Sequence, residues 1–211
     1  MIYKKINMTT WNRREHYAAF SAMSCSFSIT VDIEVSNVLQ VLKKQGYKFY
    51  PSMIYLLTNA VNQVPAFKMG MKEGELIEWN RIHPSYTIFH PESETFSSLW
   101  TEYHADISQF MMNYNLDYQR YQRDLAFSPK PNMPRNIFHI SCLPWMSFTG
   151  FNLNVPKVED YFSPIITFGK YRIDSDKTYL PVAIQVHHAV CDGFHVAKFV
   201  EALQQLCDEF S

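Results

Sequence analysis

PVAIQVHHAVCDGFHV, residues 181–196, passes from a strand-like pattern to a helix-like one. One face of the predicted strand, residues 178–188, is formed by Leu180, Val182, Ile184, Val186 and His188. His187 falls on the other face, and a helix is predicted directly afterwards, over 194–210. His188 therefore ends an apolar stripe, where burial favours the neutral imidazole. A neutral imidazole with a free nitrogen is suited to act as a general base.

Three other interpretations of this junction remain open. His187, His188, Asp192 and His195 could hold a metal ion, although adjacent strand residues point to opposite faces and cannot easily share one ligand sphere. His188 could be a core histidine whose hydrogen bonds are satisfied, which does not explain a second histidine and the following Asp-Gly. Asp192 could cap the last helix, alone or in addition to another role.

The rest of the chain mixes strands and helices in no regular order. The most regular strand is SFSITVDIEV, residues 26–35, which alternates strictly between apolar and polar residues. Further helices are predicted over 10–23 with Thr10 as cap, from Ser36 or Asn37 to Gly46, from Pro51 to Val64, and over 106–125. Further strands are predicted around a hairpin at 72–74 and over 85–91, 95–100, 137–142, 148–154 and 164–171. The mixture predicts an α/β protein, an α+β two-layer sandwich in which helices pack on a mixed sheet, as one domain over residues 1–211.

The composition restricts the class of function. The 211 residues carry 19 basic and 20 acidic side chains, a net charge of −1, which argues against a nucleic-acid binder. Aromatic residues make up 16% of the chain and charged residues only 18%, below the roughly 25% of typical soluble domains. So many rings predict that part of the surface is covered by a partner subunit or by an aromatic ligand.

The termini and cysteines indicate a cytoplasmic protein. The start, MIYKKINMTTW, lacks the apolar segment of a secretory signal, and no apolar run is long enough to span a membrane. The four cysteines show no CxxC spacing and are expected to be reduced thiols.

A family resemblance covers essentially the whole chain. HHAVCDGFH, residues 187–195, resembles the HHxxxDG signature of trimeric, class A chloramphenicol acetyltransferases, which dihydrolipoamide acyltransferases share. Further segments resemble the acetyltransferases rather than the dihydrolipoamide acyltransferases, and they occur in the same order: WNRREH (11–16), YKFYPSMIY (47–55), TFSSLW (95–100), FNLNV (151–155) and SPIIT (163–167). The resemblance implies the fold of CoA-dependent acyltransferases, acetyl-CoA as co-substrate without a metal, chloramphenicol as acceptor, and no membrane partner.

The resemblance also implies catalytic roles for individual residues. His188 matches the base that takes the proton of the 3-hydroxyl of chloramphenicol, whose oxygen then attacks the thioester directly, without an acyl-enzyme. Ser141 matches the donor to the resulting oxyanion, and Thr167 matches a residue that holds a nearby water. Taken alone, Ser141 would be an ordinary strand serine.

Asp192 matches a structural carboxylate whose partner is an arginine, here Arg13. The residues give separate support, because Arg13 and Arg14 fall in the first turn of a predicted helix, where the helix dipole disfavours cations. Such a position is easier to explain if one arginine has a carboxylate partner. The alternative, that both are simply solvated, costs only tenths of a kcal/mol.

The remaining matches are to pocket residues, each of which could equally belong to the core. Positions around the antibiotic are matched by Phe20, Cys25, Phe27, Phe96, Ser98, Leu153 and Val155. Positions near the coenzyme are matched by Trp145, Lys170 and Tyr171. The loop 127–136 aligns poorly, and no role is transferred to it. The family implies a homotrimer with sites between subunits. Two alternatives remain: an acyltransferase of the same fold with another hydroxyl or thiol acceptor, and a non-catalytic small-molecule binder.

Overall fold

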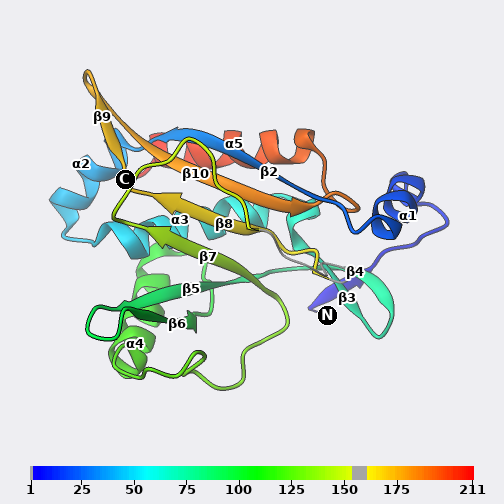
Figure 1. Ribbon diagram of the computed structural model, residues 1–211, viewed down its shortest axis with the longest axis horizontal. Helices are drawn as coiled ribbons and strands as arrows, with labels where there is room; N and C mark the ends of the chain where they lie inside the picture. The colour runs from blue at the N-terminus through cyan, green and yellow to red at the C-terminus, as the bar shows by residue number, and fades with distance from the viewer. Residues whose placement is uncertain (1, 154–160) are drawn as a thin grey trace.

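A computed structural model describes residues 2–153 and 161–211. Along the chain the elements are β1 (Tyr3–Lys5), α1 (Arg14–Ala22), β2 (Ser26–Glu34), α2 (Ser36–Gln45), α3 (Phe49–Gln63), a 3-10 helix (Pro65–Lys68), β3 (Met69–Lys72), β4 (Glu75–Trp79), β5 (His83–His90), β6 (Thr95–Trp100), α4 (Ile107–Tyr121), β7 (Ile137–Leu143), β8 (Ile165–Gly169), β9 (Arg172–Asp174), β10 (Lys177–His187) and α5 (Gly193–Asp208). Figure 1 shows their arrangement.

The larger of two sheets is mixed, as predicted. Its strand order is β2-β10-β8-β7-β5-β6, and β9 pairs with β10 beside this path. β7 runs parallel to β5 and to β8, and the other pairs are antiparallel. A smaller antiparallel sheet has the order β1-β4-β3.

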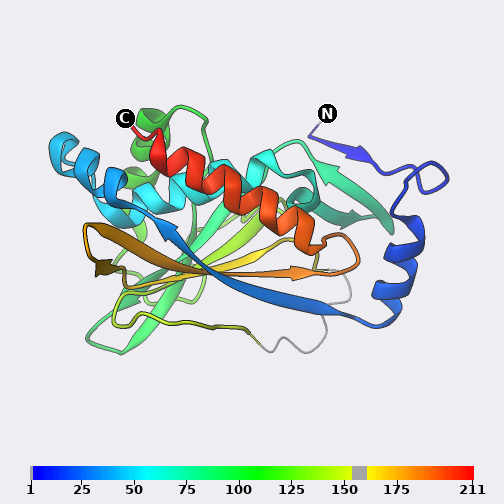
Figure 2. The same cartoon turned by 90° about the horizontal axis from the view of Figure 1, so that it is seen from above.

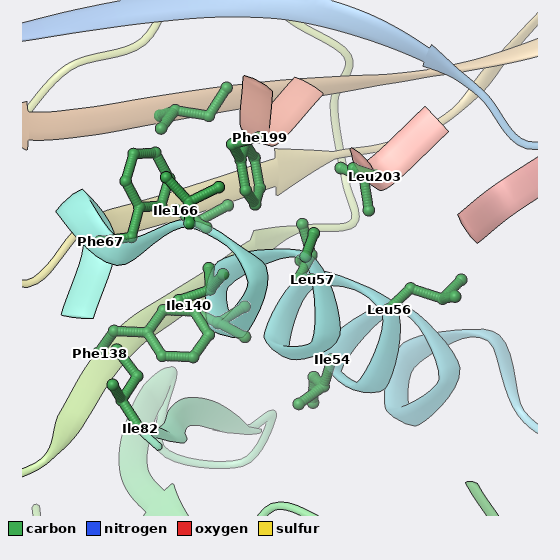
Figure 3. Close-up of a cluster of buried hydrophobic side chains, with 14 of the residues drawn as sticks. Ile54, Leu56, Leu57, Phe67, Ile82, Phe138, Ile140, Ile166, Phe199 and Leu203 are labelled. Atoms are coloured by element: carbon green, nitrogen blue, oxygen red, sulfur yellow. The ribbon is translucent and has the colours of Figure 1, made fainter. Parts of the chain in front are cut away.

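Helices α2, α3, α4 and α5 lie on one side of the large sheet, as Figure 2 shows from above. α3 is buried almost all round and contacts α4, α5 and β5. Between α3, α5 and the sheet lie Leu57, Phe138, Ile140, Ile166 and Phe199 (Figure 3), which are all fully buried or nearly so. Each large apolar side chain removed from water contributes about 1.5–3 kcal/mol, so this layer is the main stabilising core.

The strand alternation predicted in β2 and β10 sets which face each residue occupies. In the antiparallel register Val182 pairs with Val31, Ile184 with Ile29 and Val186 with Phe27. Val182, Ile184 and Val186 are buried against the helices. Ala183, Gln185 and His187 therefore point to the other side of the sheet, which we call the open face.

Several predicted boundaries differ from the structure. α1 begins at Arg14 rather than residue 10, because residues 7–11 form a turn of their own in which the Asn7 carbonyl accepts from the amides of Thr10 and Trp11. Neither Ser36 nor Asn37 caps α2, since the Ser36 hydroxyl accepts from the amide of Thr178. Gly46 does end α2, at a φ of +75° that favours glycine.

The predicted strand at 148–154 is wrong over its described part. Residues 148–153 are irregular and cross the open face, where their backbone groups bond to side chains of the sheet. Ser28 donates to the Phe151 carbonyl at 2.9 Å, and the Leu153 amide donates to Gln185 at 2.8 Å. β1 and β9, each three residues long, were not predicted. In the part of the chain that the structure describes, the helices are too short or too polar to cross a membrane.

Candidate active site

The turn after β10 is fixed by its own backbone and by His187. The amides of Val190 and Cys191 both donate to the His187 carbonyl at 3.2 Å. The Ala189 amide donates to His187 Nδ1 at 3.1 Å, so this ring carries its proton on Nε2. The side chain is buried against the edge of Phe162, and burial lowers the pKa of the His187 imidazole. A neutral His187 therefore holds the turn that presents His188.

His188 lies between two aromatic rings at the exit of β10. Its ring stacks on Phe20 with centroids 3.8 Å apart and meets the edge of Phe27 at 5.1 Å. Its amide donates to the Cys25 carbonyl at 2.8 Å, and its Nδ1 is 3.0 Å from the Cys191 carbonyl. The side chain is 28% exposed, so one side of the ring is accessible from outside the chain.

Arg13 ties the same turn to α1. It donates through Nε to the Ala189 carbonyl at 2.9 Å and through Nη2 to the His188 carbonyl at 2.6 Å. It also forms a two-pronged ion pair with Asp192, in which Nη2 lies 2.7 Å from Oδ1 and Nη1 contacts Oδ2. The hydrogen bonds from Arg13 hold the pKa of the Asp192 carboxyl below its usual range. The structure therefore brings together the two residues that the resemblance pairs.

Hydrogen bonds within the turn occupy several of the side-chain atoms that could bind a metal ion. His187 Nδ1 accepts from Ala189, His195 Nδ1 accepts from the Asp192 amide at 2.9 Å, and the Asp192 carboxylate is held by Arg13. Within residues 2–153 and 161–211 there is no group of three or more His, Cys, Asp or Glu side chains placed to hold a metal. Asp192 also occupies the N-cap position of α5, where its amide donates to His195 Nδ1 at 2.9 Å while its carboxylate pairs with Arg13.

A row of hydroxyl groups crosses the open face. Ser98 on β6 pairs with Thr87 on β5, and Ser141 on β7 pairs with Thr167 on β8. Tyr86 pairs with Ile140, which places Thr87 beside Ser141 one residue further along these parallel strands. Leu153 lines a small crevice with Thr167, and Phe96 lies on β6, half-exposed. These predicted site residues thus share one surface.

That surface is distant from His188 within one chain. Thr167 pairs with Ala183, five residues before His188, and successive strand residues advance about 3.3 Å, so the separation is roughly 16 Å along the strand. Ser141 is on β7, one strand further from β10 than Thr167. Ala183, the partner of Thr167, also points to the open face, whereas the apolar stripe that leads to His188 points to the helices. A single substrate atom in one chain cannot contact both His188 and Ser141.

The three residues matched to the coenzyme line one cavity of about 480 Å³. Trp145 follows β7, and Lys170 and Tyr171 follow β8. The opposite wall is the start of α3, with Lys48 and Phe49, and Phe49 meets Tyr171 edge to face at 5.5 Å. The sequence interpretation did not single out Lys48, although it lies just before a predicted helix, and the amides of a helix N-terminus favour anions.

The predicted residues thus form three groups. Arg13, Phe20, Cys25, Phe27 and Asp192 surround His188, whereas Phe96, Ser98, Ser141, Leu153 and Thr167 lie on the open face. Trp145, Lys170 and Tyr171 line the cavity. Val155 lies outside the described residues.

Solved structures identify the fold as that of acyltransferases. A chloramphenicol acetyltransferase superposes with a TM-score of 0.86 at 21% identity, over 97% of this chain and 99% of that one. A dihydrolipoamide acetyltransferase of Azotobacter vinelandii superposes with a TM-score of 0.63 at 15% identity, over 92% of this chain and 86% of that one. The chain therefore has the α/β fold of acyltransferases.

Sequence relatives are more specific. The family model described as chloramphenicol acetyltransferase matches residues 1–204. Chloramphenicol acetyltransferase 2 of Escherichia coli is 48% identical over 209 residues, 99% of this chain and 98% of that protein. A chloramphenicol acetyltransferase of Proteus mirabilis is 47% identical over 205 residues, 97% of this chain and 94% of that protein. The chain belongs to the chloramphenicol acetyltransferase family and is an acyltransferase enzyme.

Proposed function

We propose that the protein transfers the acetyl group of acetyl-CoA to the 3-hydroxyl of chloramphenicol, with His188 as general base. The observation that carries this proposal is the 3.0 Å contact between His188 Nδ1 and the Cys191 carbonyl. A carbonyl oxygen only accepts, so Nδ1 must be the donor, and in the neutral ring the free lone pair is on Nε2. The names of the relatives support the choice of acceptor and acyl group.

The proposed reaction needs one base and no acyl-enzyme. Nε2 of His188 takes the hydroxyl proton while the oxygen forms a bond to the thioester carbon, and collapse of the tetrahedral intermediate breaks the carbon–sulfur bond. The imidazolium then returns its proton to the CoA thiolate. Two nearby thiols are poor nucleophiles, because burial raises the pKa of Cys142 and of Cys191 to about 12 and keeps both protonated; direct transfer needs neither.

The oxyanion of the intermediate is assigned to Ser141, with Thr167 beside it. Because these residues are far from His188 in one chain, we propose that they act on the His188 of a second copy, in a homotrimer with sites between subunits. This arrangement is supported by the two half-sites, each of which is incomplete by itself: His188 is 28% exposed, and Ser141 is partly exposed beside the buried Thr167. Phe20, Cys25 and Phe27 would then face Phe96, Ser98 and Leu153 across the acceptor pocket.

The cavity of about 480 Å³ is proposed to bind the coenzyme. Its wall combines Lys48 and Lys170 with the N-terminus of α3, and helix N-termini and cations both favour phosphate groups. Trp145 and Tyr171 offer aromatic faces in the same cavity. The four free cysteines are consistent with a reducing compartment, so we place the enzyme in the cytoplasm.

The direct test is release of free thiol by purified protein given acetyl-CoA and chloramphenicol. His188→Ala should lower kcat by about 10²- to 10⁴-fold, the usual contribution of a positioned base. Full activity of this variant would refute the mechanism. If a different alcohol or thiol gives a far higher kcat/KM, the acceptor assignment is wrong, and saturable binding without turnover would make the protein a binder.

A mixing experiment tests the shared site. His188→Ala and Ser141→Ala chains, each inactive alone, are denatured and refolded together at equal concentrations. If base and oxyanion donor come from different chains, about one quarter of the interfaces regain both groups and activity returns to about 25%. No recovery in mixed oligomers, or a particle of the 24.8 kDa chain mass in light scattering, would contradict the proposed assembly.

A further inference from the structure

The segment between α4 and β7, residues 122–136, has no regular structure and wraps around the outer edge of β6 (Figure 1). β6 is the last strand of the large sheet, so one of its edges has no neighbouring strand. The segment carries the poorly aligned residues 127–136, to which the resemblance gives no role. Two sets of contacts attach it to β6 and α4.

The first attachment is at Lys130. Its ammonium group donates to Asp117 Oδ2 on α4 at 2.8 Å and lies 2.7 Å from Oδ1. It also donates to the Trp100 carbonyl at 3.2 Å and lies 3.7 Å from the centroid of the Trp100 ring. Each side chain of the ion pair is only 16% exposed. A lysine held on three sides in this way restrains the loop much more strongly than a surface ion pair.

The second attachment is through β6 itself. The Ser98 amide donates to the Phe127 carbonyl at 2.6 Å. The Ser97 hydroxyl lies 2.7 Å from the Ala126 carbonyl and 2.9 Å from the Asp124 carbonyl, and donates to this pair. His90 Nε2, 2.8 Å from the same hydroxyl, must then be the donor. This serine and histidine therefore serve as an anchor.

Together the two attachments hold the backbone that carries the ring of Phe127. This ring meets the ring of Phe96 at 6.0 Å and 63°, and the Phe127 side chain is 68% exposed. Phe96 pairs with Phe89 in the sheet register, and Phe89 meets Trp145 edge to face at 4.8 Å. Phe127, Phe96, Phe89 and Trp145 therefore form a row of rings along the open face, from the loop to the proposed coenzyme cavity.

We propose that Lys130, through its contacts with Asp117 and Trp100, is a positioning residue for acceptor binding. It holds the loop so that Phe127 and Phe96 form one apolar wall for the acceptor. This inference rests on the proposed function, because it takes Phe96 as part of the acceptor pocket. Without the Lys130 contacts, the loop would become ordered only when the acceptor binds. The free energy of that ordering would weaken the binding of the acceptor but not that of acetyl-CoA.

The test compares Lys130→Met with Lys130→Arg. In Lys130→Met we expect KM for chloramphenicol to rise about three- to tenfold, which corresponds to roughly 0.7–1.4 kcal/mol of added ordering cost. KM for acetyl-CoA and kcat should stay within about twofold. A raised KM with an unchanged kcat means that the variant loses the same binding free energy for the acceptor in the ground state and in the transition state. Lys130→Arg should restore KM, because a guanidinium can pair with Asp117 and stack on Trp100. Lys177→Met, which removes an exposed partner of Glu34, is the matched control and should leave every constant unchanged.

A double variant separates positioning from simple destabilisation. Lys130→Met leaves the Asp117 carboxylate without its cation, so the melting temperature should fall. Asp117→Asn with Lys130→Met removes that unpaired charge and should recover stability, while KM for chloramphenicol stays raised. The inference is overturned if KM returns to normal with stability, or if Lys130→Met does not change it. If the unaltered enzyme fails to acetylate chloramphenicol, the proposed function itself has failed.

Discussion

Replacement of Arg13 by methionine is expected to uncouple the turn after β10 from α1 while it keeps the aliphatic part of the side chain. The guanidinium makes two bonds to the carbonyls of His188 and Ala189 and a two-pronged pair with Asp192. The arginine side chain is 12% exposed and that of Asp192 is 36% exposed. The lost pair is therefore neither a surface pair nor a fully buried one.

The expected magnitude follows from that intermediate exposure. Breaking a buried ion pair costs about 3–5 kcal/mol, and an exposed one at most about 1 kcal/mol. Asp192 can regain part of its hydration, so we expect a loss of about 2–3 kcal/mol in the free energy of unfolding. For a chain of this size that loss lowers the melting temperature by about 5–10 °C.

Activity should fall further than stability alone explains. The carbonyl of His188 is one of the groups released, and a displacement of about 1 Å in a reacting group can cost 10²-fold in rate. We expect kcat, measured at a temperature where the variant is fully folded, to fall about 10- to 100-fold. Asp192→Asn combined with Arg13→Met should recover part of the stability, since no lone carboxylate remains, but not the rate.

Arg172 provides a matched control within the same chain. It makes the same two-pronged contact with Asp32, at 2.6 and 2.7 Å, but these side chains are 44% and 43% exposed. Arg172→Met should therefore cost no more than about 1 kcal/mol and leave kcat unchanged. The reasoning is refuted if the two methionine variants lose equal stability, or if Arg13→Met keeps kcat within twofold.

Three further predictions concern pH and the backbone. The pKa of Asp192 is lowered in the folded chain, so its carboxylate stabilises the fold above the unfolded pKa, and this stabilisation is lost as pH falls through the folded pKa. The difference in unfolding free energy between the wild type and Asp192→Asn, measured by urea unfolding, should therefore shrink below about pH 4. The pKa of His187 is lowered in the folded chain, so below about pH 6.5 the unfolded chain binds a proton that the folded chain does not, and stability should fall as pH drops. In His187→Asn, whose side-chain oxygen can still accept from the Ala189 amide, this fall of stability with pH should be smaller. If the slopes of the two proteins coincide, His187 is not the group responsible. Gly46→Ala should cost about 1–2 kcal/mol because φ is +75°, whereas Gly150→Ala, which also has open space around its Cα, should cost less; equal losses would contradict the backbone explanation.

Local patterns predicted the elements whose partners lie along the same strand or helix. The alternation of residues 26–35 is the clearest case, since its faces agree with the register against β10. Prediction failed where a tertiary contact replaced a local one. Asn37 was a possible cap for α2, but its amide donates to the carbonyls of Cys207, Asp208 and Phe210 at the end of α5. Nothing near Asn37 in the sequence indicates that contact.

The candidate site divides in the same way. The motif and its flanking strand locate His188 and Asp192, and the helix-dipole argument indicates a partner for one of the two arginines at the start of the first helix, Arg13 and Arg14. The sequence does not contain the strand order, and the order β10-β8-β7 is what separates His188 from Ser141. Residues that the resemblance assigns to one site therefore occupy two places on the chain, which no spacing along the sequence could reveal.

The surplus of aromatic rings is now divided between two causes. Twelve of the 33 are buried in the core of this chain, among them Phe67, Phe110, Phe138, Phe168 and Phe199, and need no partner. Six rings in the described residues are exposed, and of these only Phe194 lies away from the open face and the cavity. The other five, Phe89, Phe96, Phe127, Trp145 and Tyr171, lie beside the hydroxyl row or in the proposed coenzyme cavity. Exposed rings cost free energy in water unless something covers them. Their concentration around Ser141, far from His188 in the same chain, is the physical reason to expect the proposed second copy and the two proposed substrates there.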